Sequence, residues 1–198
     1  MLKKFILAVL IVASASFAQL HIHVGGRAAV NYGTIWGDGT DVAKWGVGFN
    51  AGATAKMAVN PMIDFVSGLE VELRRFSVDW FLYDDWSFSF WYIDLPLLAR
   101  FNINPQFYAD AGLNLAFNIV ASETTKSLGH TTTDDVDGSQ SVDLGFVIGA
   151  GFNVMPNLDV NVRALLGFTN MIGYGDDFAS KNLRFQLGVT YWFHEFQF

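Results

Sequence analysis

From residue 20 onward, apolar side chains alternate with polar or small ones at every second position, and this pattern recurs in eight separate segments. Successive side chains of a β-strand point to opposite faces, so each segment predicts a strand with one apolar and one polar face. Every segment reaches the roughly 9–11 residues that a tilted strand needs to cross a bilayer. The segments comprise residues 20–32, 45–59, 63–76, 91–103, 107–120, 142–154, 158–169 and 183–193.

The connections between these segments alternate in length. Three are short and contain a proline, at Asn60-Pro61, Asn104-Pro105 and Met155-Pro156-Asn157, and four are long and polar, at residues 33–43, 77–88, 121–141 and 170–182. Short turns at one rim and long loops at the other are typical of an up-and-down outer-membrane barrel. The remaining proline, Pro96, falls inside a predicted strand and lacks a ladder donor, so we expect a bulge or a local break there.

The charges on the polar faces indicate which face of the strands points into the barrel. After residue 18 no stretch has the roughly 18 apolar residues of a membrane helix, which leaves a membrane barrel, a secreted β-sandwich or a lipocalin-like barrel. Seven acids and six bases share the polar faces, and such a balanced set can pair across a narrow lumen. We therefore predict an all-β, eight-stranded antiparallel transmembrane barrel with a lumen charge network. Its members are Arg27, Lys56, Asp64, Glu70, Glu72, Arg74, Asp94, Arg100, Asp110, Asp143, Asp159, Arg163 and Arg184.

Residues 1–18 have the features of a cleavable signal peptide. Lys3 and Lys4 precede an apolar stretch, and Ser16-Phe17-Ala18 places small residues at the two positions that signal peptidase reads. The apolar stretch is too short for a membrane anchor, which needs about 20 residues. We expect cleavage before Gln19 and a barrel domain over residues 19–198, with both termini on the periplasmic side of the outer membrane.

Charge and composition exclude several classes of partner. The chain has 12 Lys and Arg against 19 Asp and Glu, for a net charge of -7. This acidic balance argues against nucleic acid, which would require a basic patch. The absence of cysteine excludes disulfides and thiolate metal sites. We therefore expect the protein to be surrounded by membrane lipid and to bind no cofactor.

Aromatic residues gather near the predicted strand ends, where membrane barrels carry aromatic girdles. Trp80 and Trp86 could instead simply anchor a loop. The set beside the long loops is Trp36, Trp45, Trp80, Tyr83, Trp86 and Trp91, and the set near the other rim is Phe65, Phe107, Tyr191 and Phe193.

The last strand resembles the C-terminal signal of outer-membrane barrels, with a polar residue, a glycine and two alternating aromatics at Gln186, Gly188, Tyr191 and Phe193. A second register ends on Phe198. The resemblance implies recognition by the barrel-assembly machinery.

The segment from Tyr92 to Phe101, with its Pro-Leu-Leu core and Arg100, resembles the PorT-like outer-membrane β-barrel family. Residues 68–73 and 107–112 also fit that family. Some members assist protein secretion, and the family has no agreed catalytic residues, so the resemblance implies none here.

Three functions are open to such a chain. The first is a structural or interaction protein, because side chains fill an eight-stranded barrel and acidic loops would face outside. The second is a narrow channel, since glycines on the polar faces would leave room for water. The third is an enzyme, for which His130 with Ser127, Asp134 and Asp135 would have to form a site, or, as the family resemblance implies, a secretion accessory. The glycines are Gly46, Gly48, Gly52, Gly112, Gly145, Gly149, Gly151 and Gly188.

Two features of the sequence weakly suggest a metal-binding site. His21 and His23 share a face, and closure of the barrel could bring His194 and Glu195 near them. Imidazole suits zinc or nickel, but nothing defines a third ligand, so we expect rim histidines bound to water and no metal site. The fragment Asp135-x-Asp137-Gly138 lacks the distal Glu of a calcium loop.

Overall fold

The computed structural model describes residues 21–37, 43–78, 85–127, 130–136, 139–171 and 180–197. Within these ranges the chain forms strands and tight turns, and it contains no helix with the length and apolar character needed to cross a membrane. The expected signal peptide, Trp80, Tyr83, Asp137 and Phe198 lie outside the described residues. The strands are β1 (His21–Trp36), β2 (Ala43–Asn60), β3 (Ile63–Val78), β4 (Asp85–Asn102), β5 (Phe107–Ser127), β6 (His130–Asp135), β7 (Val142–Met155), β8 (Leu158–Asn170) and β9 (Lys181–Gln197).

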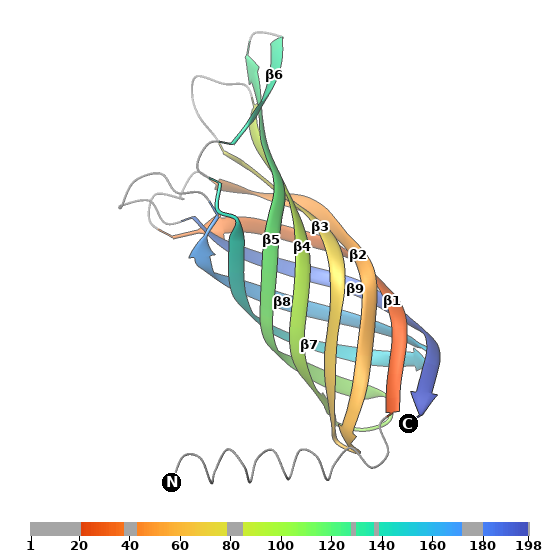
Figure 1. The fold of residues 1–198 in the computed structure, drawn as a ribbon. Helices are drawn as coiled ribbons and strands as arrows, with labels where there is room; N and C mark the ends of the chain where they lie inside the picture. The colour runs from red at the N-terminus through yellow and green to blue at the C-terminus, as the bar shows by residue number, and fades with distance from the viewer. Residues whose placement is uncertain are drawn as a thin grey trace, which may run out of the picture.

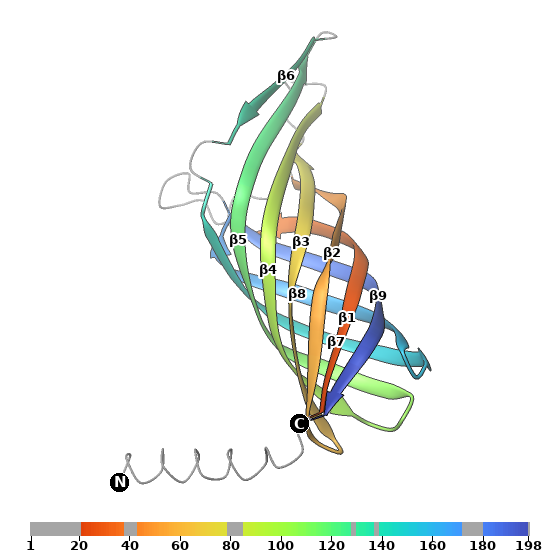
Figure 2. The same cartoon turned by 45° about the vertical axis from the view of Figure 1, so that its right-hand side comes forward.

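Eight of these strands close into a ring in which every neighbour is antiparallel. β1 to β5 follow one another around the wall, β7 pairs with β5, and β8 and β9 lead back to β1. The closing pair runs from His21–Gln197 to Trp36–Lys181, with one bulge between Val24 and Gly25. The strands are strongly tilted, so β7 to β9 cross behind β3 to β5 (Figure 1; Figure 2). The predicted eight-stranded antiparallel meander is confirmed.

The wall is longer than the sequence pattern indicated, at the end opposite the three short turns. β5 continues to Ser127 and pairs there with β6, a six-residue strand inside a segment predicted to be a loop. β3 and β4 likewise extend into the predicted loop at 77–88. Because β6 reads His-Thr-Thr-Thr-Asp-Asp, it has no apolar face, and the alternation used to find the other strands is missing.

Pro96 lies within the continuous strand β4 and produces no bulge. Pairing between β3 and β4 passes from Ser67–Leu97 to Glu70–Asp94 without a change of register, so the ladder is interrupted only locally. Proline lacks the N–H that this side of the ladder needs. On its other side, Pro96 still pairs with Asn114 of β5. Of the two expected irregularities, the structure shows the local break in the pairing with β3 and no bulge.

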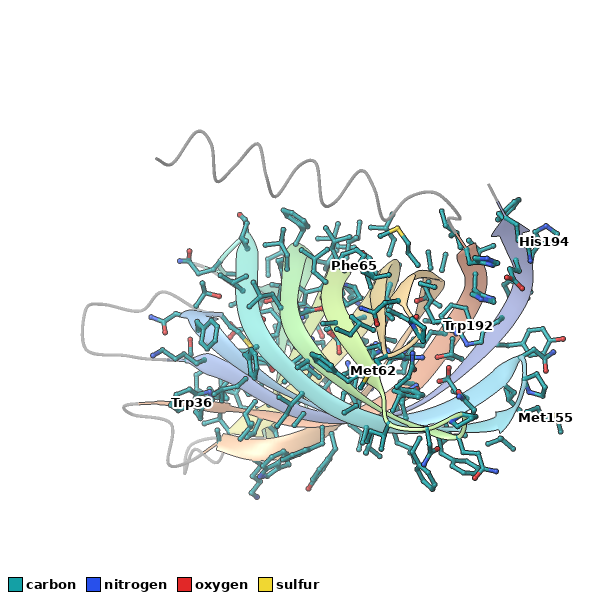
Figure 3. The ribbon with its side chains drawn as sticks, turned by 90° about the horizontal axis from the view of Figure 1, so that it is seen from below. Trp36, Met62, Phe65, Met155, Trp192 and His194 are labelled. Carbon is teal, nitrogen blue, oxygen red and sulfur yellow. The ribbon has the colours of Figure 1, made fainter. Side chains whose placement is uncertain are left out.

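The apolar rows face outward around the wall. Leu187 is 59% exposed and Ile148 is 53% exposed, whereas the intervening polar positions are buried. A soluble lipocalin-like barrel would have the opposite arrangement. Trp36 and Trp45 are exposed near the loop end and Phe193 near the other, and Figure 3 shows Trp36 and His194 at opposite ends of the barrel. Trp86 differs from the girdle prediction, because it packs inward against Phe88.

Candidate functional site in the barrel lumen

The lumen of the barrel is filled by charged side chains. Of the thirteen charged residues that the sequence assigns to the polar faces, twelve are buried, each with at most 6% of its surface exposed. The thirteenth, Lys56, is half-buried and places its ammonium group 4.9 Å from the ring centre of Trp192. The alternation of apolar and polar residues directs these charged side chains into the lumen, because each strand must present its apolar face to lipid.

The part of the network nearer the loop end is centred on Arg74. Its guanidinium binds three carboxylates, with distances of 2.8 Å to Glu72, 2.9 Å to Asp94 and 2.6 Å to Asp143. Arg184 enters the same cluster at 3.0 Å from Glu72 and 3.3 Å from Asp94. These groups come from β3, β4, β7 and β9, so the cluster joins opposite walls of the barrel.

The middle of the lumen is crossed by Arg27. Its Nη1 donates to Glu70 at 2.7 Å, and its Nη2 donates to Asn161 at 3.2 Å and to Gln186 at 3.1 Å. Asn50 also donates to Glu70. β1 is thereby bonded to β3, β8 and β9 through one side chain.

A second cluster lies toward the short turns. Arg100 binds both oxygens of Asp110, at 2.9 and 3.2 Å, and reaches Asp159 at 3.5 Å. Arg163 donates to Asp110 at 3.1 Å. Asp159 also accepts hydrogen bonds from Tyr108 and from the indole of Trp192. Bidentate arginine–carboxylate pairs are directional, and the one between Arg100 and Asp110 joins the register partners of the neighbouring strands β4 and β5, whereas Arg100–Asp159 and Arg163–Asp110 reach non-adjacent strands.

At this turn-side end, Asp64 accepts a hydrogen bond from Asn102 at 3.0 Å rather than pairing with an arginine.

An apolar cluster, here called the loop-end plug, closes the lumen above Arg74. Its buried members include Phe76, Phe88 and Phe90, with the rings of Phe76 and Phe88 stacked at 4.9 Å. Tyr92 lies beneath them, and the Arg74 guanidinium sits 3.8 Å from its ring centre. The full set is Ile35, Phe76, Phe88, Phe90, Tyr92, Ala116, Ala121, Val136 and Met171.

Sequence reasoning missed the plug because residues 77–88 read as a loop. A signal was nevertheless present, since Phe88, Phe90 and Tyr92 alternate with Ser87, Ser89 and Trp91 in step with the inward-facing Asp94. This period of two would have extended the strand and directed the aromatics inward.

Neighbouring backbone or side-chain atoms occupy the space beside the lumen glycines. A Cβ on Gly151 would collide with the ring of Tyr108, and one on Gly188 would lie 2.9 Å from Arg27 Nη2 and 3.0 Å from Asn161 Oδ1. Two cavities along the lumen each have a volume of about 10 Å³. A cavity of that size holds about one water molecule.

The rim histidines lie where barrel closure was expected to bring them. His21 Nδ1 is 2.7 Å from Glu195 Oε1, and His23 Nε2 is 4.0 Å from the same oxygen. His194 instead packs its ring against Phe196. Among the residues described here, no three potential ligands are placed to hold a metal ion.

The residues of the expected assembly signal lie on β9, between β8 and β1. Gln186 and Gly188 face the lumen, whereas Tyr191 and Phe193 are 46% and 67% exposed on the outer face. His130, Asp134 and Asp135, considered for catalysis, are exposed on β6 rather than in a pocket.

Comparison with known proteins agrees with the architecture. A family model described as an outer membrane protein beta-barrel domain matches residues 17–173. Among solved structures, the chain is similar to Ail, the attachment invasion locus protein of Yersinia pestis, solved with the heparin analogue sucrose octasulfate. Identity is 18% over 87% of this chain and 99% of that chain, with a TM-score of 0.53.

Neisserial surface protein A is similar at 16% identity, over 87% of this chain and 97% of that chain, with a TM-score of 0.52. At these identities the likeness concerns the fold alone. No curated protein sequence matches the chain.

Proposed function

Because this chain belongs to the family of outer membrane protein beta-barrel domains, we propose that it is a non-conducting barrel with a structural or interaction role. The observation that carries the proposal is the packed lumen. Paired charges join opposite walls along its length, and the loop-end plug lies above them. Such a barrel is a rigid support for whatever its loops present, and it needs no enzymatic activity.

The shape of the loop end supports the interaction role. β5 and β6 project beyond the rim of the ring (Figure 2), and all six side chains of β6 are exposed. Asp134 and Asp135 are among these exposed side chains, and the sequences of the long connections are rich in aspartate, so we expect this end to carry negative charge. The acidic residues are Asp38, Asp41, Asp84, Asp85, Asp134, Asp135, Asp137, Asp176 and Asp177. Negative charge favours a cationic partner, unlike the polyanionic heparin analogue bound to Ail.

The proposal also covers how the protein is exported and assembled. Residues 1–18 act as the signal peptide, and the loops face outward while both termini face the periplasm, as in other barrels with short periplasmic turns. The resemblance of the last strand supports recognition by the assembly machinery through Gln186, Gly188, Tyr191 and Phe193, or in the second register through Phe198. The resemblance of the Pro-Leu-Leu segment around Pro96 supports the further proposal that the chain is PorT-like.

Single-channel recording on the refolded protein in planar bilayers tests the proposal. The packed lumen predicts no steady openings, whereas a narrow channel for ions or small solutes would open repeatedly. Gel mobility before and after boiling shows that the recorded sample is a folded barrel. Steady conductance from such a sample would establish the channel function instead.

A further inference from the structure

The outer wall of the barrel has a hollow across four adjacent strands. It has a volume of about 630 Å³, within the range of small-molecule sites. Ala150 of β7 and Ala164 of β8 form a shallow floor, and larger outward-facing side chains surround them. The surrounding side chains are Val30, Tyr32, Ile148, Val162, Phe185 and Leu187.

These lining side chains place the hollow on the membrane-facing side. Val30, Val162 and Leu187 are 58%, 54% and 59% exposed, and the positions between them point into the lumen. Within an outer-membrane barrel, the molecules that meet this surface are lipid acyl chains. The hollow is therefore in contact with hydrocarbon.

A cation lies above the hollow on the same face. Lys181 pairs in register with Trp36, and Tyr32 pairs with Phe185, four residues further down β9. The Lys181 ammonium is 5.2 Å from the ring centre of Trp36, a residue type common at the membrane interface. Above the hollow, Trp45 stacks against both Tyr32 and Phe185, with ring centres 4.9 and 5.9 Å apart.

The spacing between the cation and the hollow matches one leaflet. Lys181 and Leu187 are six residues apart, or about 20 Å along a strand. At the usual tilt of about 40° this is about 15 Å of depth, half of the roughly 30 Å hydrocarbon core. A chain whose headgroup lies beside Lys181 would end in the hollow.

We propose that the hollow binds one acyl chain of an outer-membrane lipid whose anionic phosphate headgroup is held by Lys181. The site requires the membrane location but not the closed lumen, so its failure would leave the proposed function untouched. An anionic lipid within reach of one interfacial lysine is favoured about fivefold over a zwitterionic one.

Site-specific quenching tests this site on the whole refolded protein in phosphatidylcholine nanodiscs. The chain has no cysteine, so Val162→Cys, at the edge of the hollow, accepts a single fluorophore that leaves the floor open, and Ala51→Cys, exposed on β2 away from the hollow, is the matched control. The quenchers are phosphatidylglycerol and phosphatidylcholine that carry the same mid-chain nitroxide. We expect about fivefold stronger quenching by phosphatidylglycerol at position 162 and equal quenching by both lipids at position 51.

Two further variants distinguish the contribution of the headgroup from the contribution of the hollow. In Lys181→Gln, the preference for phosphatidylglycerol at position 162 should disappear, and in Ala150→Phe the quenching there should fall because the floor is filled. Equal quenching by both lipids at position 162, or a preference that survives in Lys181→Gln, overturns the proposal. Unchanged quenching in folded Ala150→Phe overturns it as well, and if that variant does not fold, Lys181→Gln decides.

Discussion

Arg74 is the most connected cation of the lumen, and its replacement tests whether the network stabilises the barrel. In Arg74→Met, three carboxylates lose a partner at 2.6 to 2.9 Å, and every group involved is at most 4% exposed. Arg184 still contacts Glu72 and Asp94. Asp143 keeps only the hydroxyl of Thr169, at 2.8 Å.

One orphaned buried carboxylate therefore dominates the loss. Removing one partner of a buried ion pair costs about 3–5 kcal/mol, because the remaining charge is desolvated without compensation. We expect the free energy of unfolding to fall by about that amount in Arg74→Met. Adding Asp143→Asn should restore most of the loss, since the uncompensated charge is then gone.

Equilibrium unfolding in guanidinium from lipid vesicles measures these differences. The neighbouring Arg75 is exposed on the same strand, so Arg75→Met is a matched control with an expected change within about 0.5 kcal/mol. A loss below about 1 kcal/mol in Arg74→Met would refute the reasoning, and so would a double variant no more stable than the single one.

Three further changes test the orientation of the wall and the packing of the lumen. Leu187→Lys places a charge on the lipid face near mid-depth and should cost about 2–4 kcal/mol in the same unfolding assay; no loss would contradict the outward orientation of this row. Phe90→Ala removes a fully buried ring from the loop-end plug and should cost about 3–5 kcal/mol. A much smaller loss would mean that the ring contributes little packing. Gly188→Val inserts a side chain against Arg27 and Asn161 and should cost about 1–3 kcal/mol through overpacking, whereas unchanged stability would indicate free lumen space and favour a channel.

The sequence alone was sufficient to predict the strands, their meander order and the division of their faces. Alternation at Leu187 and Gly188 assigns neighbours to opposite sides whatever the partner strand is, because a strand's side chains have a period of two. The near balance of acids and bases indicated which side is enclosed. The strand β6 (His130–Asp135) was not predicted, since a polar, exposed hairpin carries no periodic apolar signal.

The tertiary structure decided which groups meet. Arg74 and Asp143 are 69 residues apart in the chain, and Arg27 and Gln186 are 159 apart. Their contact depends on the register of every intervening pair and on the closure of β9 onto β1. A shift of one residue in the register of any strand pair would move each side chain of the shifted strand to the opposite face of the wall. Local sequence determines the face of each residue, whereas only the closed ring determines its partner, its lumen neighbours and the hollow on its outer wall.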